Sequence, residues 1–241
     1  MNFRPLPLSL SGIAALLFAA CSVSGSGATP TLAPVAVTTQ VAPSRAPDLS
    51  TPLATSSTET GDGLTWSLAP NGNEARYRVH EQLVELTLPG DAVGVTSAIS
   101  GQIVLQADGG VVREESKFVV DLTTLHSDKS RRDGFIQRNT LNTSAFPLAE
   151  FVPTQAIGLP SPLPTSGEVA FQLLGELTVH GVTREATWDV TAFVNGQDLV
   201  GSAKTTITFA DFDMQIPRVP VVLSVEEIIG LEFDFHLVAE F

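Results

Sequence analysis

Alternation of apolar and polar residues runs through much of the C-terminal half of this sequence and restricts how the chain can fold. Near the C-terminus, Leu231, Phe233 and Phe235 alternate with Glu232 and Asp234. The same period of two links Val169, Phe171, Leu173, Leu177 and Val179, then Ala186, Trp188, Val190, Ala192 and Val194, and then Ile207 and Phe209. Because successive side chains of a strand point to opposite faces, each segment predicts a strand that buries one face. Such alternation is typical of antiparallel sheets.

Turn signals separate these segments from further apolar runs. Hairpin turns are predicted at Gly109-Gly110 and at His180-Gly181. Additional strands are predicted over residues 77–79, 83–88, 99–105 and 118–122. The pattern predicts an all-β fold with a short helix or loop near residues 129–145, and about eight strands closed antiparallel would form a single β-barrel. A sandwich of two sheets satisfies the alternation equally well.

The first 62 residues carry export signals and a tether. Residues 1–20 combine Arg4 with an apolar run that ends directly before Cys21, which predicts a lipoprotein-type signal peptide. Cys21 is the only cysteine, so lipidation is the predicted role of its thiol. We expect residues 21–62 to form the lipidated cysteine and a disordered tether rich in Pro, Ser, Thr and Ala. We expect residues 63–241 to form one exported domain, held at the cell membrane facing the periplasm or exterior, or secreted if Cys21 is not lipidated.

Charge and residue spacing argue against several classes of function. Without residues 1–20 the chain has 12 basic and 26 acidic residues, a formal charge of −14, which repels nucleic acid. The histidines at positions 80, 126, 180 and 236 show no metal-ligand spacing. Ser127 lies between His126 and Asp128, but neighbours in an extended segment point to opposite faces and cannot form a triad. We therefore expect no enzyme activity, no metal and no cofactor.

Four of the basic residues of the mature chain lie within ten positions, at Lys129, Arg131, Arg132 and Arg138. If this cluster lies at the mouth of a barrel, its guanidinium groups suit an anionic or polar ligand headgroup. Arg131, Arg132 and Arg138 are the headgroup candidates. The alternative is a solvated loop in which Asp128 and Asp133 pair with these cations.

Two segments of the sequence resemble the YceI-like family. They are residues 132–151, RDGFIQRNTLNTSAFPLAEF, and residues 174–184, LGELTVHGVTR. The resemblance extends from about Trp66 to Phe241, and it implies an extracytoplasmic, lipocalin-like barrel. It therefore favours the barrel over the sandwich, and it makes Arg132-Asp133 a family motif that holds its own loop.

The resemblance also implies a function, which is to bind, sequester or carry a long-chain polyisoprenoid or similar lipid. The bound chain could be an isoprenoid, a quinone-like molecule or a fatty chain, and a homodimer is a further expectation. The candidate ligand contacts in the apolar interior are Phe118, Val120, Leu122, Phe171, Leu173, Trp188, Val190, Phe209, Phe233 and Phe235. Two alternatives remain: a non-catalytic surface interaction module whose side chains fill the barrel completely, and a lipid-modifying enzyme.

Overall fold

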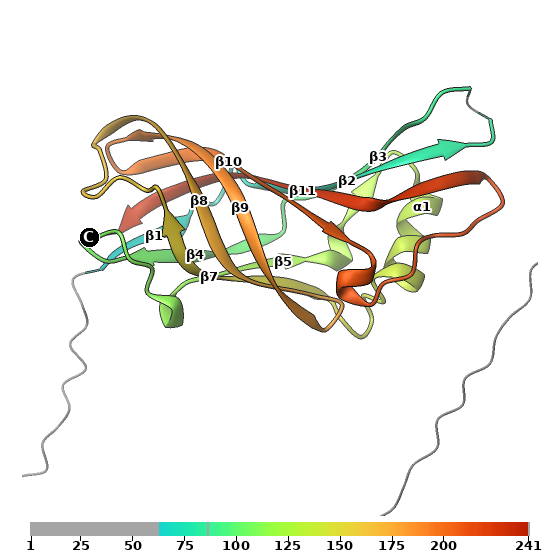
Figure 1. The fold of residues 1–241 in the computed structure, drawn as a ribbon, viewed down its shortest axis with the longest axis horizontal. Helices are drawn as coiled ribbons and strands as arrows, with labels where there is room; N and C mark the ends of the chain where they lie inside the picture. The colour runs from blue at the N-terminus through green and yellow to red at the C-terminus, as the bar shows by residue number, and fades with distance from the viewer. Residues whose placement is uncertain (1–62, 86, 241) are drawn as a thin grey trace, which may run out of the picture. The chain divides into compact units, whose positions relative to one another are not determined.

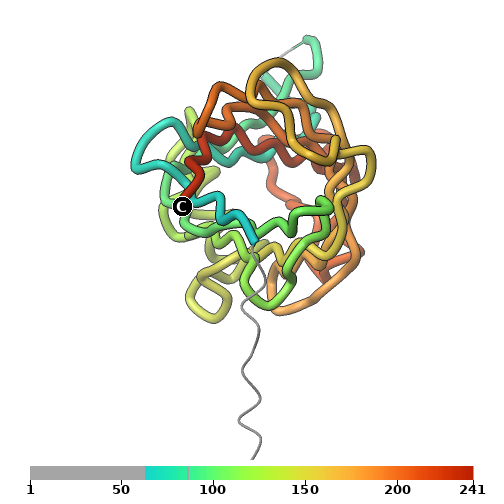
Figure 2. Tube along the Cα trace, turned by 90° about the vertical axis from the view of Figure 1, so that its left-hand side faces the viewer, coloured from blue at the N-terminus to red at the C-terminus, as the bar shows by residue number. Residues whose placement is uncertain are grey.

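The computed structural model describes residues 63–85 and 87–240, and eight of its strands form a closed antiparallel barrel. In order around the ring these are β1 (Leu64–Leu68), β4 (Ile99–Leu105), β5 (Lys117–Asp121), β7 (Leu148–Ile157), β8 (Ser166–Val179), β9 (Val182–Asn195), β10 (Asp198–Thr208) and β11 (Val222–Glu240). β1 pairs with β11, with Trp66 opposite Ala239, and this pairing closes the ring. Figure 2 shows the strands as a ring. The predicted all-β barrel is confirmed, and the two-sheet sandwich is wrong.

The period of two in the sequence determines which side chains face the interior. In β9, Trp188, Val190, Ala192 and Val194 are buried, whereas the residues that alternate with them are exposed. β8 pairs with β9 so that Phe171 lies opposite Val190 and Leu173 opposite Trp188. Directly opposite residues share a face of the sheet, so the apolar sets of neighbouring strands line the same side.

Three further strands extend the sheet beyond the ring. They are β2 (Glu74–Leu83), β3 (Gly90–Thr96) and β6 (His126–Ser127). β11 is 19 residues long; its last residues pair with β1, whereas residues 222–234 pair with β2. The sheet therefore divides at β11, and Figure 1 shows β2, β3 and the beginning of β11 projecting past the other strands.

A short helix lies at the end of the barrel from which these strands project. α1 (Ser130–Phe135) continues through a π-helical turn over Ile136–Thr140, in agreement with the short helix predicted for this region. An ion pair between Arg132 of α1 and Glu81 of β2 joins the helix to the projecting strands. Figure 1 shows α1 beside β2 and β3.

Several boundaries differ from the prediction. The strand predicted over residues 83–88 is wrong, because β2 ends at Leu83 and β3 begins only at Gly90. Pro89 lacks a backbone N–H and cannot donate to a sheet, which explains why pairing resumes only after it. β5 and β10 end one residue before Leu122 and Phe209, yet both of these side chains remain buried.

Gly101 of β4 allows the neighbouring strand β5 to approach closely. Its φ is +138°, and a Cβ at this position would lie 2.1 Å from the carbonyl oxygen of Lys117. We expect Gly101→Ala to lower the free energy of unfolding by about 2 kcal/mol or more, because both the backbone angle and the contact are strained. Urea unfolding measures this change. Gly90→Ala is the matched control, since a Cβ at Gly90 meets nothing within 4 Å; equal stability of the two variants would contradict the prediction.

Candidate functional site

The interior of the barrel contains a cavity of about 730 Å³. Its lining is mostly apolar and comes from the ring strands, from β2 and from the helix. All ten interior residues proposed from the sequence line it, namely Phe118, Val120, Leu122, Phe171, Leu173, Trp188, Val190, Phe209, Phe233 and Phe235. The barrel is therefore not filled by its own side chains. Which of these residues contact a ligand stays a prediction.

Aromatic rings form a large part of the cavity wall. Phe118 and Phe233 meet edge to face with ring centroids 5.9 Å apart, and Phe151 and Trp188 do so at 5.7 Å. Edge-to-face contact places the positive rim of one ring against the negative face of the other. These pairs join β5 to β11 and β7 to β9, so the wall is held in shape by contacts between side chains as well as by the sheet.

The loop that carries the basic cluster is fixed by Arg132 and Asp133. The Arg132 guanidinium contacts Glu81 at 2.5 Å and Asp128 at 2.6 Å. The Asp133 carboxylate accepts hydrogen bonds from the amide (2.9 Å) and the hydroxyl (2.5 Å) of Ser127. Arg132 lines the cavity, but its donors are directed at two carboxylates. These contacts favour the interpretation that the Arg132-Asp133 motif holds its loop.

The other two headgroup candidates lie in different places. Arg131 is exposed, lines the cavity and has no ion pair with any residue that the structure describes. Arg138 is also exposed but is not among the residues that line the cavity. Of the three arginines, only Arg131 combines access to the cavity with an uncommitted charge, and its contact with a headgroup stays a prediction. Cys21 lies outside the described residues.

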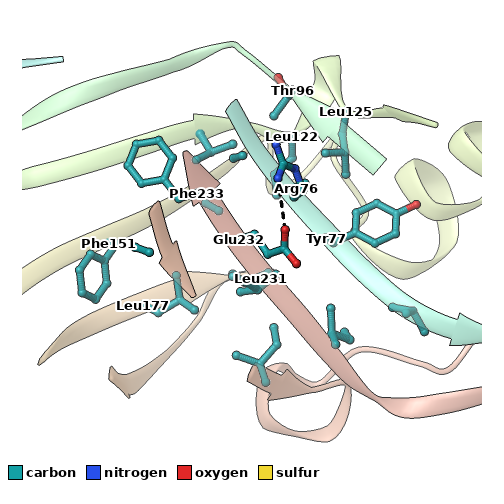
Figure 3. Close-up of a pocket in the computed structure, with 18 of the residues that line it drawn as sticks. Arg76, Tyr77, Thr96, Leu122, Leu125, Phe151, Leu177, Leu231, Glu232 and Phe233 are labelled. Carbon is teal, nitrogen blue, oxygen red and sulfur yellow. Dashed lines mark hydrogen bonds and ion pairs between the residues drawn. The ribbon is translucent and has the colours of Figure 1, made fainter. Parts of the chain in front are cut away.

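A second group of charges lies where β2 leaves the barrel. Arg76 of β2 contacts Glu74 at 2.6 Å, Glu232 at 3.2 Å and Asp234 at 2.6 Å. Figure 3 shows Arg76 and Glu232 meeting across the pocket wall. Burial opposes ionisation of Glu232, yet its hydrogen bond to Arg76 and the charge of Arg78 lower the pKa of this carboxyl. The network fixes the junction between β2 and β11 at the edge of the cavity.

A family model described as the YceI-like domain matches residues 66–239. The chain belongs to the YceI-like family. This confirms the resemblance that the two sequence segments indicated.

Relatives of this YceI-like chain include a UPF0312 protein of Pseudomonas fluorescens (strain SBW25), which is 34% identical over 113 residues, 43% of this chain and 55% of that protein. A UPF0312 protein of Pseudomonas putida (strain GB-1) matches to the same extent. The chain thus spans about half the length of the curated relatives it matches.

Two solved structures share the fold of the YceI-like chain. A polyisoprenoid-binding domain from Saccharophagus degradans matches with a TM-score of 0.59 at 12% identity, over 73% of this chain and 99% of that one. The YceI protein of Campylobacter jejuni matches with a TM-score of 0.51 at 15% identity, over 66% of this chain and 91% of that one. At these identities the likeness concerns the fold.

Metal binding, a serine nucleophile and membrane-spanning helices were each considered for the described part of this YceI-like domain. Among residues 63–85 and 87–240, no cluster of His, Cys, Asp and Glu could hold a metal ion. The Ser127 hydroxyl donates to Asp133, so it is engaged in holding the loop rather than paired with His126. In the same part of the chain, none of the helices is long and apolar enough to cross a membrane.

Tyr77 is a polar residue of the site that the sequence analysis did not single out. It lies on β2, lines the cavity, and packs over Gly94 so closely that a Cβ there would be 2.2 Å from the ring. Tyr77 lies two positions before Val79, so both side chains face the interior, and this spacing could have identified Tyr77 from the sequence. Burial raises the pKa of its phenol to about 12, although the charge of Arg132 acts to lower it. The hydroxyl therefore stays protonated at neutral pH.

The titration of Tyr77 can be measured directly because it is the only tyrosine in the chain. We expect tyrosinate absorbance to appear with a midpoint near pH 12 in the folded protein, against about 10 after denaturation. The folded state binds the phenolic proton more tightly than the unfolded state does. The contribution of Tyr77 to the free energy of unfolding is therefore fully present below about pH 10 and is lost as the pH rises towards 12. Tyr77→Phe should remove the signal. A midpoint near 10 in the folded protein would show that the phenol is solvated and would contradict its place in the cavity.

Proposed function

We propose that this YceI-like protein binds a long-chain lipid, a polyisoprenoid or a chain of similar apolar character, and stores or carries it without changing it chemically. The observation that carries the proposal is the apolar cavity of about 730 Å³ inside a closed barrel. Its volume falls in the range of roughly 300–1,000 Å³ that is usual for ligand sites. The fold is shared with a domain from Saccharophagus degradans that binds polyisoprenoids, which supports the proposal.

Hydrocarbon burial supplies enough free energy for such a ligand to bind without a covalent bond. Each five-carbon isoprene unit contributes at most about 4 kcal/mol, at roughly 0.8 kcal/mol per buried methylene. The lost freedom of the chain and of the complex offsets a large part of this. A chain of several units can therefore bind tightly, and we expect its specificity to depend on cavity length and on polar lining residues such as the exposed Arg131.

The proposal includes a location outside the cytoplasm. The signal peptide predicted over residues 1–20 and the lipidation predicted at Cys21 support export and attachment to the membrane surface. A lipid carrier tethered in this way stays beside the bilayer from which an insoluble ligand has to come. Metabolic labelling with a fatty acid, compared between the natural chain and Cys21→Ser, tests the anchor independently of ligand binding.

Solvent extraction tests the binding function itself. The protein purified from cells is extracted with organic solvent and the extract is analysed by mass spectrometry, in parallel with an unrelated exported protein purified in the same way. We expect a long-chain lipid in near-stoichiometric amount from the YceI-like protein only. Absence of any such lipid, together with no uptake of a fluorescent prenyl or fatty probe, would overturn the proposal.

A further inference from the structure

The residues that line the cavity are exposed to solvent at one end of the barrel only, among those that the structure describes. This is the end from which β2, β3 and the beginning of β11 project (Figure 1). The exposed lining residues there are Glu85, Lys129, Arg131 and Val221. At the opposite end, Leu159 and Leu163 of the loop between β7 and β8 line the cavity and are partly buried. The distribution of exposure indicates that the cavity opens at the projecting end.

Four apolar side chains are exposed beside this opening, and we call them the apolar tip. They are Val84, 54% exposed, Leu88, 75%, Val221, 60%, and Leu223, 65%. The amide of Val84 donates a hydrogen bond of 3.1 Å to the carbonyl of Val221, and Val222 pairs with Leu83, so the two segments that carry the tip lie side by side. Exposed apolar side chains gathered in one place mark a surface that contacts a protein or a membrane.

The charges around the apolar tip are mixed in sign. Residues 219–225 contain no charged residue. The exposed charged residues that flank the tip segments are Arg131 and Arg218, and Glu85, Glu226 and Glu227. Such a set does not match a strongly acidic or strongly basic partner. The headgroups of a zwitterionic phospholipid layer carry a phosphate that suits the guanidinium groups and an ammonium that suits the carboxylates.

We propose that the apolar tip inserts into the surface of a zwitterionic phospholipid bilayer, and that a lipid enters and leaves the barrel there without crossing water. Hydrocarbon burial in the bilayer drives the insertion, as it does for other proteins that lie on a membrane surface. Val221 belongs both to the tip and to the lining of the cavity, so the apolar surface continues from the bilayer contact into the interior. The passage of lipid rests on the proposed function, whereas the docking surface is a separate property.

The chain outside the described domain is long enough to permit this contact from a lipidated Cys21. β1, where the domain begins, pairs with the last residues of β11, whereas the apolar tip lies at the start of that strand. The 19 residues of β11 extend about 60 Å at roughly 3.3 Å per residue. Residues 21–62 reach at most about 140 Å at the same rise. An anchor at Cys21 therefore leaves the tip free to face the bilayer that holds the anchor.

Vesicle binding tests the proposal once the predicted acyl anchor is removed. The chain without its predicted signal peptide, residues 21–241 with Cys21→Ser, contains the whole described barrel. It is mixed with vesicles of phosphatidylcholine and phosphatidylethanolamine and separated by flotation. We expect it to float with the vesicles, and Leu88→Glu combined with Leu223→Glu should lower the partition coefficient at least about tenfold. Neither residue lines the cavity, so the affinity for a fluorescent prenyl probe in water should change less than about twofold.

A matched variant on the barrel wall controls for the loss of apolar surface and the added charge. Phe193 and Val200 are 55% and 50% exposed and lie opposite each other on β9 and β10. Phe193→Glu combined with Val200→Glu therefore makes the same kind of change away from the tip. We expect it to alter vesicle partition less than about twofold.

Fluorescence reports insertion directly, because Cys21→Ser leaves the chain without a thiol. An environment-sensitive fluorophore on Leu88→Cys should shift to the blue when vesicles are added, and spin-labelled lipid should quench it. The same fluorophore on Asp108→Cys, in the turn that follows β4 at the opposite end, should show neither change.

The outcomes separate the docking surface from the lipid-binding function. Failure of the unaltered tip to bind vesicles, equal binding by the tip variant, or an equal loss in the wall variant would each overturn the proposal, while probe binding in water would leave the cavity function intact. A dimer that the tip substitutions convert to a monomer in analytical ultracentrifugation would show that a second copy covers the tip, and would also overturn it. A folded protein that docks through the tip but takes up no lipid would keep the docking surface and refute the proposed function.

Discussion

Replacing Ala203 with tryptophan should strongly weaken binding of long-chain lipid while the barrel stays folded. Ala203 lies on β10, opposite Val190 of β9 and Phe233 of β11, and its methyl group lines the cavity. An indole at this position would fill part of the space that the proposed ligand chain has to occupy. We expect at least a tenfold loss in affinity for a fluorescent prenyl probe, measured by equilibrium titration.

The same ring placed outside the barrel should have little effect on binding. Thr206 lies three residues further along β10 and is exposed, so Thr206→Trp adds the same side chain on the outer face. Overfilling a packed core typically costs about 1–3 kcal/mol, and an open cavity should keep Ala203→Trp at the low end of that range. A folded Ala203→Trp protein that binds the probe as well as the unaltered chain would show that lipid is not held in the interior.

Replacing Arg132 with methionine should destabilise the protein by about 3 kcal/mol. Its partner Glu81 has a side chain only 10% exposed, and Arg132 itself is 15% exposed. Removing one member of a buried ion pair leaves the other charge desolvated and unpaired, at a cost of about 3–5 kcal/mol, and the partial exposure of this pair places it at the lower end. Urea unfolding of the two proteins measures the difference.

Removing both charges should restore most of the lost stability. In the double variant Arg132→Met with Glu81→Leu no buried charge is left unpaired, because the remaining partner Asp128 is exposed to solvent, and we expect it within about 1.5 kcal/mol of the unaltered chain. Arg131→Met is the neighbouring control, since Arg131 has no ion pair with a described residue, and it should change stability by less than about 0.5 kcal/mol. An Arg132→Met protein as stable as the Arg131→Met control would show that the pair does not hold the loop.

The residues that face the interior could be predicted from the sequence because the alternation of side chains depends only on the strand that carries them. Once Phe171 and Leu173 are placed on a strand, they face the same side whatever that strand pairs with. Some short or interrupted strands were not predicted. The alternation of β1 spans only five residues, which is too short to stand out from a loop, and in β7 Pro153 and an irregular register beside it interrupt the period of two.

Closure of the barrel and the partners of the mouth residues could not be derived from local pattern. Whether the sheet closes depends on the pairing of Trp66 with Ala239, and the partner of Arg132 is 51 residues away at Glu81. Spacing alone left Arg132 equally suited to a headgroup and to a carboxylate. The YceI-like resemblance favoured the structural role of the Arg132-Asp133 motif, and the ion pairs agree with it.

Because β1 opens the folded domain and β11 ends it, the compartment for the ligand does not exist on a partly synthesised chain. The ribosome has to release the final strand before the wall is complete, and contacts between such distant segments form slowly compared with those of a local hairpin. Loading of the proposed lipid would consequently follow synthesis of the whole domain, and a chain that stops a few residues early leaves an open sheet with two unpaired edges instead of a closed cavity.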